Sequence, residues 1–191
     1  MEFAINQHHR HSIRYLGYDY SQPGAYFITI VTFSRECIFG KFIGNQIQYS
    51  HLGNTVFECW YQIPSHFPKV DVEPFIIMPN HIHAIVTINS DDRSRGTIYR
   101  APTGDNQNSS SDHNSNNHVK FGNPIRGSLA TIIQTFKAEV SRRAKKELNL
   151  ANIWQRNYYE RIIRNQSEME NIANYISTNL EQWSKDPEYR G

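Results

Sequence analysis

Cysteines are few and long apolar runs are missing from this 191-residue sequence. The two cysteines, Cys37 and Cys59, form no CxxC pair, which argues against a zinc ribbon or a disulfide framework and suits a reducing cytoplasm. The longest near-apolar stretches, 25–33 and 75–78, are far shorter than the roughly 20 residues that a membrane-spanning helix needs. The first residues contain no apolar signal-peptide region. We therefore expect a soluble, cytoplasmic protein that does not enter a membrane.

Several catalytic motifs are also absent. The sequence contains neither G-x-x-x-x-G-K-[ST] nor G-x-G-x-x-G, so nothing in it indicates a loop that cradles a nucleotide. It also lacks H-E-x-x-H and G-x-S-x-G, which excludes the common zinc protease and serine hydrolase signatures.

Apolar periodicity predicts an α+β fold. The expected strands are 25–33, a hairpin of 37–42 and 46–49, then 72–78 and 81–89. The expected helices are 52–63, ending at Pro64; 129–148, with Ser128 as N-cap; and a last helix opened by a capping box at 167–170. The segment 153–159 fits either an edge strand or a loop. This order predicts a ferredoxin-like antiparallel sheet with its helices packed on one face.

The predicted domain spans 25–185, between an N-terminal tail (1–24) and a C-terminal tail (186–191). Residues 91–118 interrupt it, and 104–118 hold five Asn, four Ser, two Asp and two His but no apolar side chain. Such a composition cannot repay the entropy of ordering, so we expect a flexible, disordered insertion.

Charge is distributed unevenly along the chain, although the formal net charge is only +2. Residues 119–164 contain ten Lys or Arg against three Glu, a net charge of +7, whereas 165–191 contain two basic and five acidic residues, a net charge of −3. Basic residues interleaved with aromatic ones are typical of surfaces that bind a single nucleic-acid strand. A solvated helix face would have a similar composition.

Two side-chain pairs are candidates for chemistry. His81 and His83 are two positions apart on a predicted strand, so both point to one face and can bind one divalent ion. Tyr175 and Asn179 are one helical turn apart and flank the apolar stripe of the last helix, which is formed by Met169, Ile172, Ile176, Leu180 and Trp183. The simpler alternatives are partly exposed histidines at a strand end, and an amphipathic tyrosine at the margin of the core.

Four stretches, in this order, resemble the REP-associated tyrosine transposases, which belong to the HUH superfamily of single-strand transposases. They are MPNHIHAIV at 78–86, TFK at 135–137, WQRNYYERIIR at 154–164 and YISTN at 175–179. The stretch GYDYSQPGAYF at 17–27 is also similar to the opening of such proteins. The resemblance covers about residues 10–185, and the 91–118 insertion is its main departure.

The resemblance implies a metal-assisted DNA transposase that nicks and rejoins single strands. His81 and His83 would bind Mg²⁺ or Mn²⁺, with Asn179 as a third ligand. The Tyr175 hydroxyl would attack a DNA phosphodiester, forming a 5′-phosphotyrosine link and a free 3′-OH. The partner would be single-stranded or hairpin DNA, and the enzyme a monomer or a homodimer.

Composition and position, in turn, indicate the DNA-contacting residues. These are Arg14, Lys137, Arg142, Arg143, Arg156, Tyr158 and Arg161, with Arg10 as a further candidate. Tyr158 and Tyr159 are rivals of Tyr175 as nucleophile, but they lack its helical pairing with an asparagine.

Two other functions remain open. A ferredoxin-like sheet with aromatic residues can serve as a non-catalytic single-stranded nucleic-acid-binding protein, but that function leaves the histidine pair unexplained. A metal-dependent or two-histidine phosphoesterase is the other alternative. The two-histidine type would need a second H-x-[ST] motif, which the sequence lacks.

Overall fold

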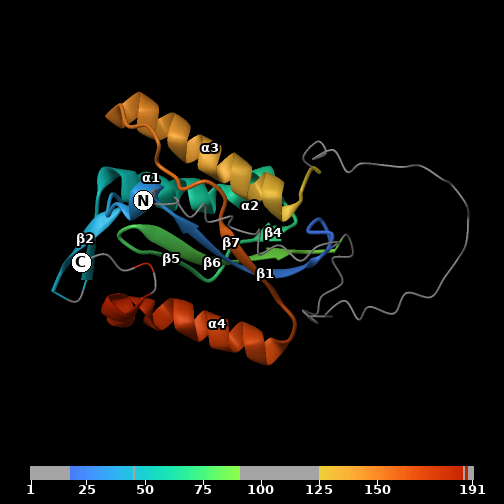
Figure 1. Ribbon diagram of the computed structural model, residues 1–191. Helices are drawn as coiled ribbons and strands as arrows, with labels where there is room; N and C mark the ends of the chain where they lie inside the picture. Colours follow the sequence, from blue (N-terminus) through green and yellow to red (C-terminus); the bar gives the residue numbers. More distant parts are fainter. Residues whose placement is uncertain (1–17, 45, 91–124, 187, 189–191) are drawn as a thin grey trace, which may run out of the picture.

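The computed structural model describes residues 18–44, 46–90, 125–186 and 188 (Figure 1). The expected insertion at 91–118 lies outside these residues, as do Arg10 and Arg14 of the expected N-terminal tail. Among the described residues, no helix combines the length and the apolar character needed to cross a bilayer.

A five-stranded antiparallel sheet lies at the centre of the fold. Its strands are β1 (Gly24–Val31), β4 (Val70–Asp71), β5 (Phe75–Ile77), β6 (His81–Ile88) and β7 (Tyr159–Ile163). β1 and β6 pair over their full length, from Gly24 opposite Ile88 to Val31 opposite His81. β7 flanks β1, whereas the short β4 and β5 both pair with β6. β6 is therefore paired on both edges, which suits its apolar sequence and its burial.

Three helices cover one face of this sheet (Figure 1). They are α1 (His51–Tyr61), α2 (Ile63–His66) and α3 (Leu129–Leu148). The predicted N-cap is confirmed, because the Ser128 hydroxyl accepts a hydrogen bond from the backbone N–H of Thr131. With α1 and α3 as crossovers, the strand order β4-β6-β1-β7 is that of the ferredoxin-like arrangement, so the predicted α+β fold is confirmed.

The last helix corrects one part of that prediction. α4 (Gln166–Thr178) lies on the opposite face of the sheet from α1 and α3, so the helices do not all pack on one face (Figure 1). Its apolar stripe packs on Ala25, Ile76 and Ile85, while Ile28, Ile82 and Val86 belong to the core on the other face. The cause lies in the sheet itself, since both of its faces carry apolar side chains that need cover.

Several element boundaries also differ from the predictions. Of the strand expected at 72–78, only β5 forms, directly after Pro74, which has no N–H to donate; the short β4 lies before the expected start. Strand β7 follows Trp154, which makes only an isolated bridge to Thr32, rather than including it. The side chain of Asn165, not Ser167, caps α4 by accepting from the backbone N–H of Glu168.

A small hairpin and two short 3-10 helices complete the described structure. β2 (Gly40–Ile43) pairs with β3 (Gln46–Tyr49), which confirms the predicted hairpin with a later start, and this pair stands apart from the main sheet. η1 (Phe33–Arg35) follows β1, and η2 (Asn179–Lys185) continues from α4. η2 leads the chain back to the start of β6, where Asp186 and Glu188 are buried.

Candidate active site

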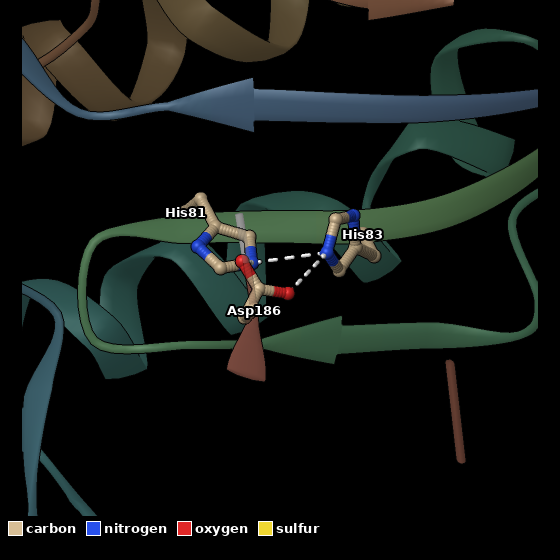
Figure 2. A group of neighbouring side chains, drawn as sticks. All are labelled: His81, His83 and Asp186. Atoms are coloured by element: carbon tan, nitrogen blue, oxygen red, sulfur yellow. Dashed lines mark hydrogen bonds and ion pairs between the residues drawn. The ribbon is translucent and has the colours of Figure 1, made fainter. Parts of the chain in front are cut away.

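The two predicted histidines form a buried pair on strand β6. His81 and His83 point to the α4 face, and Ile82 between them belongs to the core on the other face, as strand alternation predicts. The Nε2 atoms of the two imidazoles lie 3.0 Å apart (Figure 2). His81 is fully buried and His83 is 4% exposed, so the pair lies in the interior rather than on a loose strand end.

Hydrogen bonds at Nδ1 fix the orientation of both rings. Nδ1 of His83 lies 2.8 Å from the Thr29 hydroxyl, and Nδ1 of His81 lies 2.8 Å from Oδ1 of Asn80. Nδ2 of Asn80 donates to two backbone carbonyls, those of Arg35 and Glu188, which fixes its amide so that Oδ1 faces His81. Because an amide oxygen only accepts, Nδ1 of His81 carries the proton and its Nε2 keeps a lone pair.

Burial also keeps His81 neutral. Removal from water, and then the neighbouring His83, lower the pKa of His81 to about 3. A neutral imidazole with a lone pair at Nε2 is the form that binds a metal ion.

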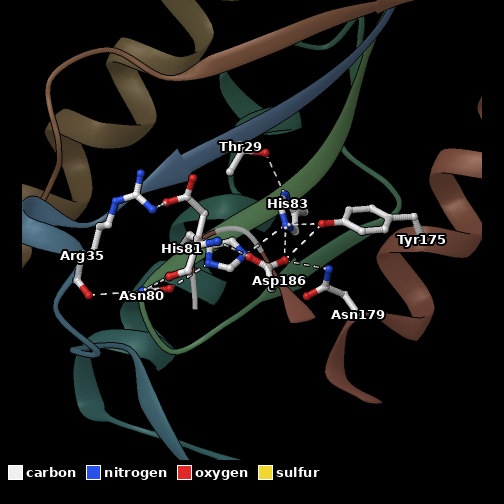
Figure 3. Close-up of polar contacts among 9 residues, drawn as sticks. Thr29, Arg35, Asn80, His81, His83, Tyr175, Asn179 and Asp186 are labelled. Carbon is white, nitrogen blue, oxygen red and sulfur yellow. Dashed lines mark hydrogen bonds and ion pairs between the residues drawn. The ribbon is translucent and has the colours of Figure 1, made fainter. Parts of the chain in front are cut away.

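Tyr175 and Asn179, the residue pair predicted on the last helix, approach the histidines from α4 and the start of η2 (Figure 3). The Tyr175 hydroxyl lies 3.2 Å from Nε2 of His83, and its ring packs edge-on against Phe27 of β1. Burial, then the nearby Asp186 carboxylate, raise the pKa of Tyr175 to about 12, so its hydroxyl is protonated at neutral pH. The residue remains 36% exposed, which leaves the phenol accessible from solvent.

Asn179 stands one turn further along, at the start of η2. It is 1% exposed, and its Nδ2 donates to Oδ2 of Asp186 at 3.1 Å. Its Oδ1 is buried without a hydrogen-bond partner. A buried amide oxygen in this condition is costly unless something else binds it, and a cation is one such group.

Asp186 is a member of the cluster that the sequence did not suggest. Sequence reasoning placed it in a C-terminal tail, but its side chain is fully buried between the histidines, Tyr175 and Asn179 (Figure 3). Burial alone would raise the pKa of its carboxyl, but the hydrogen bond from His83 and the proximity of His81 outweigh this and hold the pKa below its usual range. The only local signal was an Asp-Pro dipeptide, which predicts a turn and not a ligand.

The predicted DNA-contacting residues divide between the two faces. Lys137, Arg142 and Arg143 belong to α3, on the face opposite Tyr175 (Figure 1). The Lys137 ammonium donates to the backbone carbonyls of Gln155 and Asn157, and both arginines bind the Glu139 carboxylate. All three side chains therefore have hydrogen-bond partners within the protein.

The other basic and aromatic candidates lie near β7. Tyr158 packs against the core under α1 and α3, and Arg156 is exposed. Arg161 is the candidate nearest to the cluster: it stands opposite Phe27 in the sheet, so its side chain points to the α4 face. There it pairs with Glu168 of α4 at 2.6 Å, and 68% of its side chain remains exposed.

The chain is similar to another protein in sequence and to a solved structure in fold. No family model matches the chain. A Haemophilus influenzae (strain ATCC 51907 / DSM 11121 / KW20 / Rd) protein described as "Uncharacterized protein" is 37% identical over 185 residues, which cover 95% of this chain and 94% of that protein. Among solved structures, a REP-associated tyrosine transposase bound to a REP hairpin aligns with a TM-score of 0.55 at 15% identity. The alignment covers 88% of this chain and 73% of that chain.

Proposed function

The chain belongs to the same family as the H. influenzae protein and has the fold of a REP-associated tyrosine transposase, and on this basis we propose that it is a DNA transposase. Its reaction would be the nicking and rejoining of single-stranded DNA. The substrate would be a strand that flanks a hairpin, since the transposase of similar fold is bound to a REP hairpin.

One observation carries this proposal. The Tyr175 hydroxyl lies 3.2 Å from Nε2 of His83, within a buried cluster that also contains His81 and Asn179. A phenol beside two imidazoles and an amide places a nucleophile next to groups that can hold a cation. The simpler alternatives, an amphipathic tyrosine at the margin of the core and histidines at a strand end, do not require the Tyr175 hydroxyl to lie next to His83.

The cluster suits a divalent cation. His81 and His83 present adjacent Nε2 atoms, and Asn179 presents a buried Oδ1 that has no hydrogen-bond partner. We assign these three residues to hold Mg²⁺ or Mn²⁺, of which Mn²⁺ accepts imidazole more readily. When bound, the ion polarises the scissile phosphate and stabilises negative charge on its oxygens.

The Tyr175 oxygen is the nucleophile of a transesterification at a DNA phosphodiester. It attacks the phosphorus, the bond between phosphorus and the 3′ oxygen breaks, and the proton of the phenol is transferred to the leaving 3′ oxygen. The products are a 5′-phosphotyrosine and a 3′-OH, and attack by a 3′-OH on the phosphotyrosine reverses the step. Phe27 contacts the Tyr175 ring edge-on, and thereby holds the nucleophile over His83.

Arg161 is the residue that we assign to the DNA backbone near the reacting phosphate. Its guanidinium is exposed on the face of the sheet that carries Tyr175. Lys137, Arg142 and Arg143 belong instead to α3, on the opposite face of the sheet. Action on DNA is in keeping with the cytoplasmic location expected from the sequence.

A covalent-capture experiment tests the proposal. The full chain is incubated with Mn²⁺ and a labelled pool of hairpin oligonucleotides with randomised single-stranded flanks, and then separated on a denaturing gel. We expect a labelled protein band that EDTA abolishes. Mass spectrometry should place the nucleotide adduct on the peptide that contains Tyr175.

Two matched variants complete the test. Tyr175→Phe should remove the adduct completely, while Tyr159→Phe, which deletes the phenol of a rival nucleophile, should retain it. An adduct that persists in Tyr175→Phe contradicts the assignment of the nucleophile. DNA binding that resists EDTA, with no adduct from any oligonucleotide, would favour the non-catalytic nucleic-acid-binding protein instead.

A further inference from the structure

The Asp186 carboxylate reaches the histidine pair from the segment that follows η2 (Figure 2). Its Oδ2 lies 3.4 Å from Nε2 of His83, and its Oδ1 lies 3.7 Å from Nε2 of His81. No part of the side chain is exposed to solvent. The carboxylate is thus directed at the same two nitrogen atoms that we assign to a cation.

The spacing of these three groups is that of ligands around one ion. The donor atoms of His81, His83 and Asp186 all lie within 4.8 Å of one another. Neighbouring ligands of an octahedral ion with bonds of roughly 2.1 Å are about 3 Å apart. The two Nε2 atoms, at 3.0 Å, have that separation, and the carboxylate oxygens lie only slightly beyond it.

Charge supports the same assignment. Within the described part of the chain, the ion-pair partners of Asp186 are the two histidines, and Arg35 pairs with Glu188 instead. A carboxylate that is removed from water is costly unless a positive charge balances it. A divalent cation between the three groups supplies that charge, whereas His81, His83 and Asn179 alone offer it no anionic ligand.

Asn80 links Asp186 to His81. Its Oδ1 accepts from Nδ1 of His81, and its Nδ2 donates to the backbone carbonyl of Glu188 at 2.7 Å. The backbone N–H of Glu188 in turn donates to Oδ1 of Asp186 at 2.7 Å. One asparagine therefore orients a histidine and the segment that carries the carboxylate, as residues behind metal ligands commonly do.

We propose that Asp186 is a ligand of the divalent ion together with His81 and His83. For the role of the ion in catalysis the inference rests on the proposed function, but binding of the ion can be measured without DNA. A carboxylate oxygen adds a hard, anionic ligand, which suits Mn²⁺ or Mg²⁺ better than two imidazoles alone do.

Mn²⁺ binding to the full chain tests the inference, by titration calorimetry and by loss of the electron paramagnetic resonance signal of free Mn²⁺. Asp186→Asn keeps the shape of the side chain and removes its charge, and should weaken Mn²⁺ binding by at least about tenfold to 100-fold, the loss typical even of residues that only support a metal ligand. Asp71→Asn, the same change at an exposed position on β4, should bind like the wild type. Unchanged Mn²⁺ affinity in Asp186→Asn would overturn the inference. Tighter binding would also overturn it, because it would mean that the Asp186 carboxylate competes with the ion for the histidines.

A second variant gives a signal that a merely destabilised protein would not. In Asp186→Cys, a thiolate replaces the carboxylate and should bring Cd²⁺ into the site with an ultraviolet charge-transfer band from sulfur to metal. The wild type, which has only Cys37 and Cys59, is the control. No new band in a folded Asp186→Cys protein that still binds Cd²⁺ would contradict ligation from position 186.

The two proposals can fail separately. If Mn²⁺ binding depends on Asp186 but no adduct forms on Tyr175, the ligand assignment stands and the transposase function falls. If the adduct forms on Tyr175 while Asp186→Asn binds Mn²⁺ like the wild type, the function stands and the ligand assignment falls.

Discussion

The Tyr175 hydroxyl lies 3.2 Å from Nε2 of His83, although the two residues are 92 positions apart in the sequence. The contact joins a helix on one face of the sheet to the central strand that it covers. His83 is held in turn by Thr29 of β1, so three elements meet at one imidazole. The position of this ring is therefore the most sensitive feature of the site.

Thr29→Val should weaken metal binding with little change in shape. Valine fills the space of threonine but cannot bond to Nδ1 of His83, which lies 2.8 Å from the hydroxyl. Loss of such a partner of a metal-binding histidine typically weakens affinity by roughly tenfold to 100-fold. Calorimetric titration with Mn²⁺ measures the change. Thr55→Val, also buried but bonded within α1 to His51, should bind like the wild type.

Asn165→Ala should lower the free energy of unfolding by about 1 kcal/mol, because the N-cap of α4 would be lost. The side chain of Asn165 accepts from the backbone N–H of Glu168 at 2.8 Å. Ser167→Ala is the matched control: the sequence predicted that residue as the cap, but in the structure it lies inside the exposed first turn. Urea unfolding of both variants measures the difference. A larger loss in Ser167→Ala would restore the sequence-based cap.

Local pattern was enough to predict the histidine pair but not the complete site. Strand alternation put His81 and His83 on one face, and helical spacing put Tyr175 near Asn179. Asp186 could not be found in this way, since the bond from Asn80 that anchors its segment spans 108 positions to Glu188. Contacts of that range leave no periodic signal in the sequence.

The side of the sheet that α4 covers was likewise not encoded locally. An apolar stripe containing Ile176 shows that the helix packs on something, but not on which face. The segment 153–159, which the sequence left open between an edge strand and a loop, is mostly loop, because Trp154 and Tyr158 pack against the core under α1 and α3 and β7 begins only at Tyr159. Aromatic content alone could not decide between the two alternatives.

Lys137→Met should lower the free energy of unfolding relative to the wild type, and this difference should grow as the pH rises from about 8 to 10. Burial lowers the pKa of Lys137 to about 8, against 10.5 for an exposed lysine. In this interval the unfolded chain binds a proton that the folded chain has released, so the wild type gains stability as pH rises. The neutral amine still has two N–H groups for the carbonyls of Gln155 and Asn157.

Urea unfolding of wild type and Lys137→Met at pH 7, 8.5 and 10 measures this effect. Because the tyrosines titrate equally in both proteins, the difference between the two free energies isolates Lys137. A difference that shrinks with rising pH would mean that the ammonium form is the one stabilised in the fold.

Glu168→Gln should strengthen binding of single-stranded DNA. The change removes the ion pair that holds Arg161, which lies on the face that carries Tyr175. Glutamine can still accept from the backbone N–H of Arg164, as Glu168 Oε2 does, so the start of α4 should be preserved. A surface pair of this kind is worth roughly 0.2–1 kcal/mol, which corresponds to an affinity gain of up to about fivefold.

Glu139→Gln is the matched control for Glu168→Gln. It removes the ion pairs of Glu139 with Arg142 and Arg143 on the far face, where Arg143 still pairs with Glu58, and it should change DNA affinity less than Glu168→Gln does. Fluorescence anisotropy with a labelled hairpin oligonucleotide, at several salt concentrations, measures both variants. The salt dependence of Glu168→Gln should steepen by about one released counterion if Arg161 binds phosphate. A larger gain in Glu139→Gln would move the DNA path to α3 and away from the face of Tyr175.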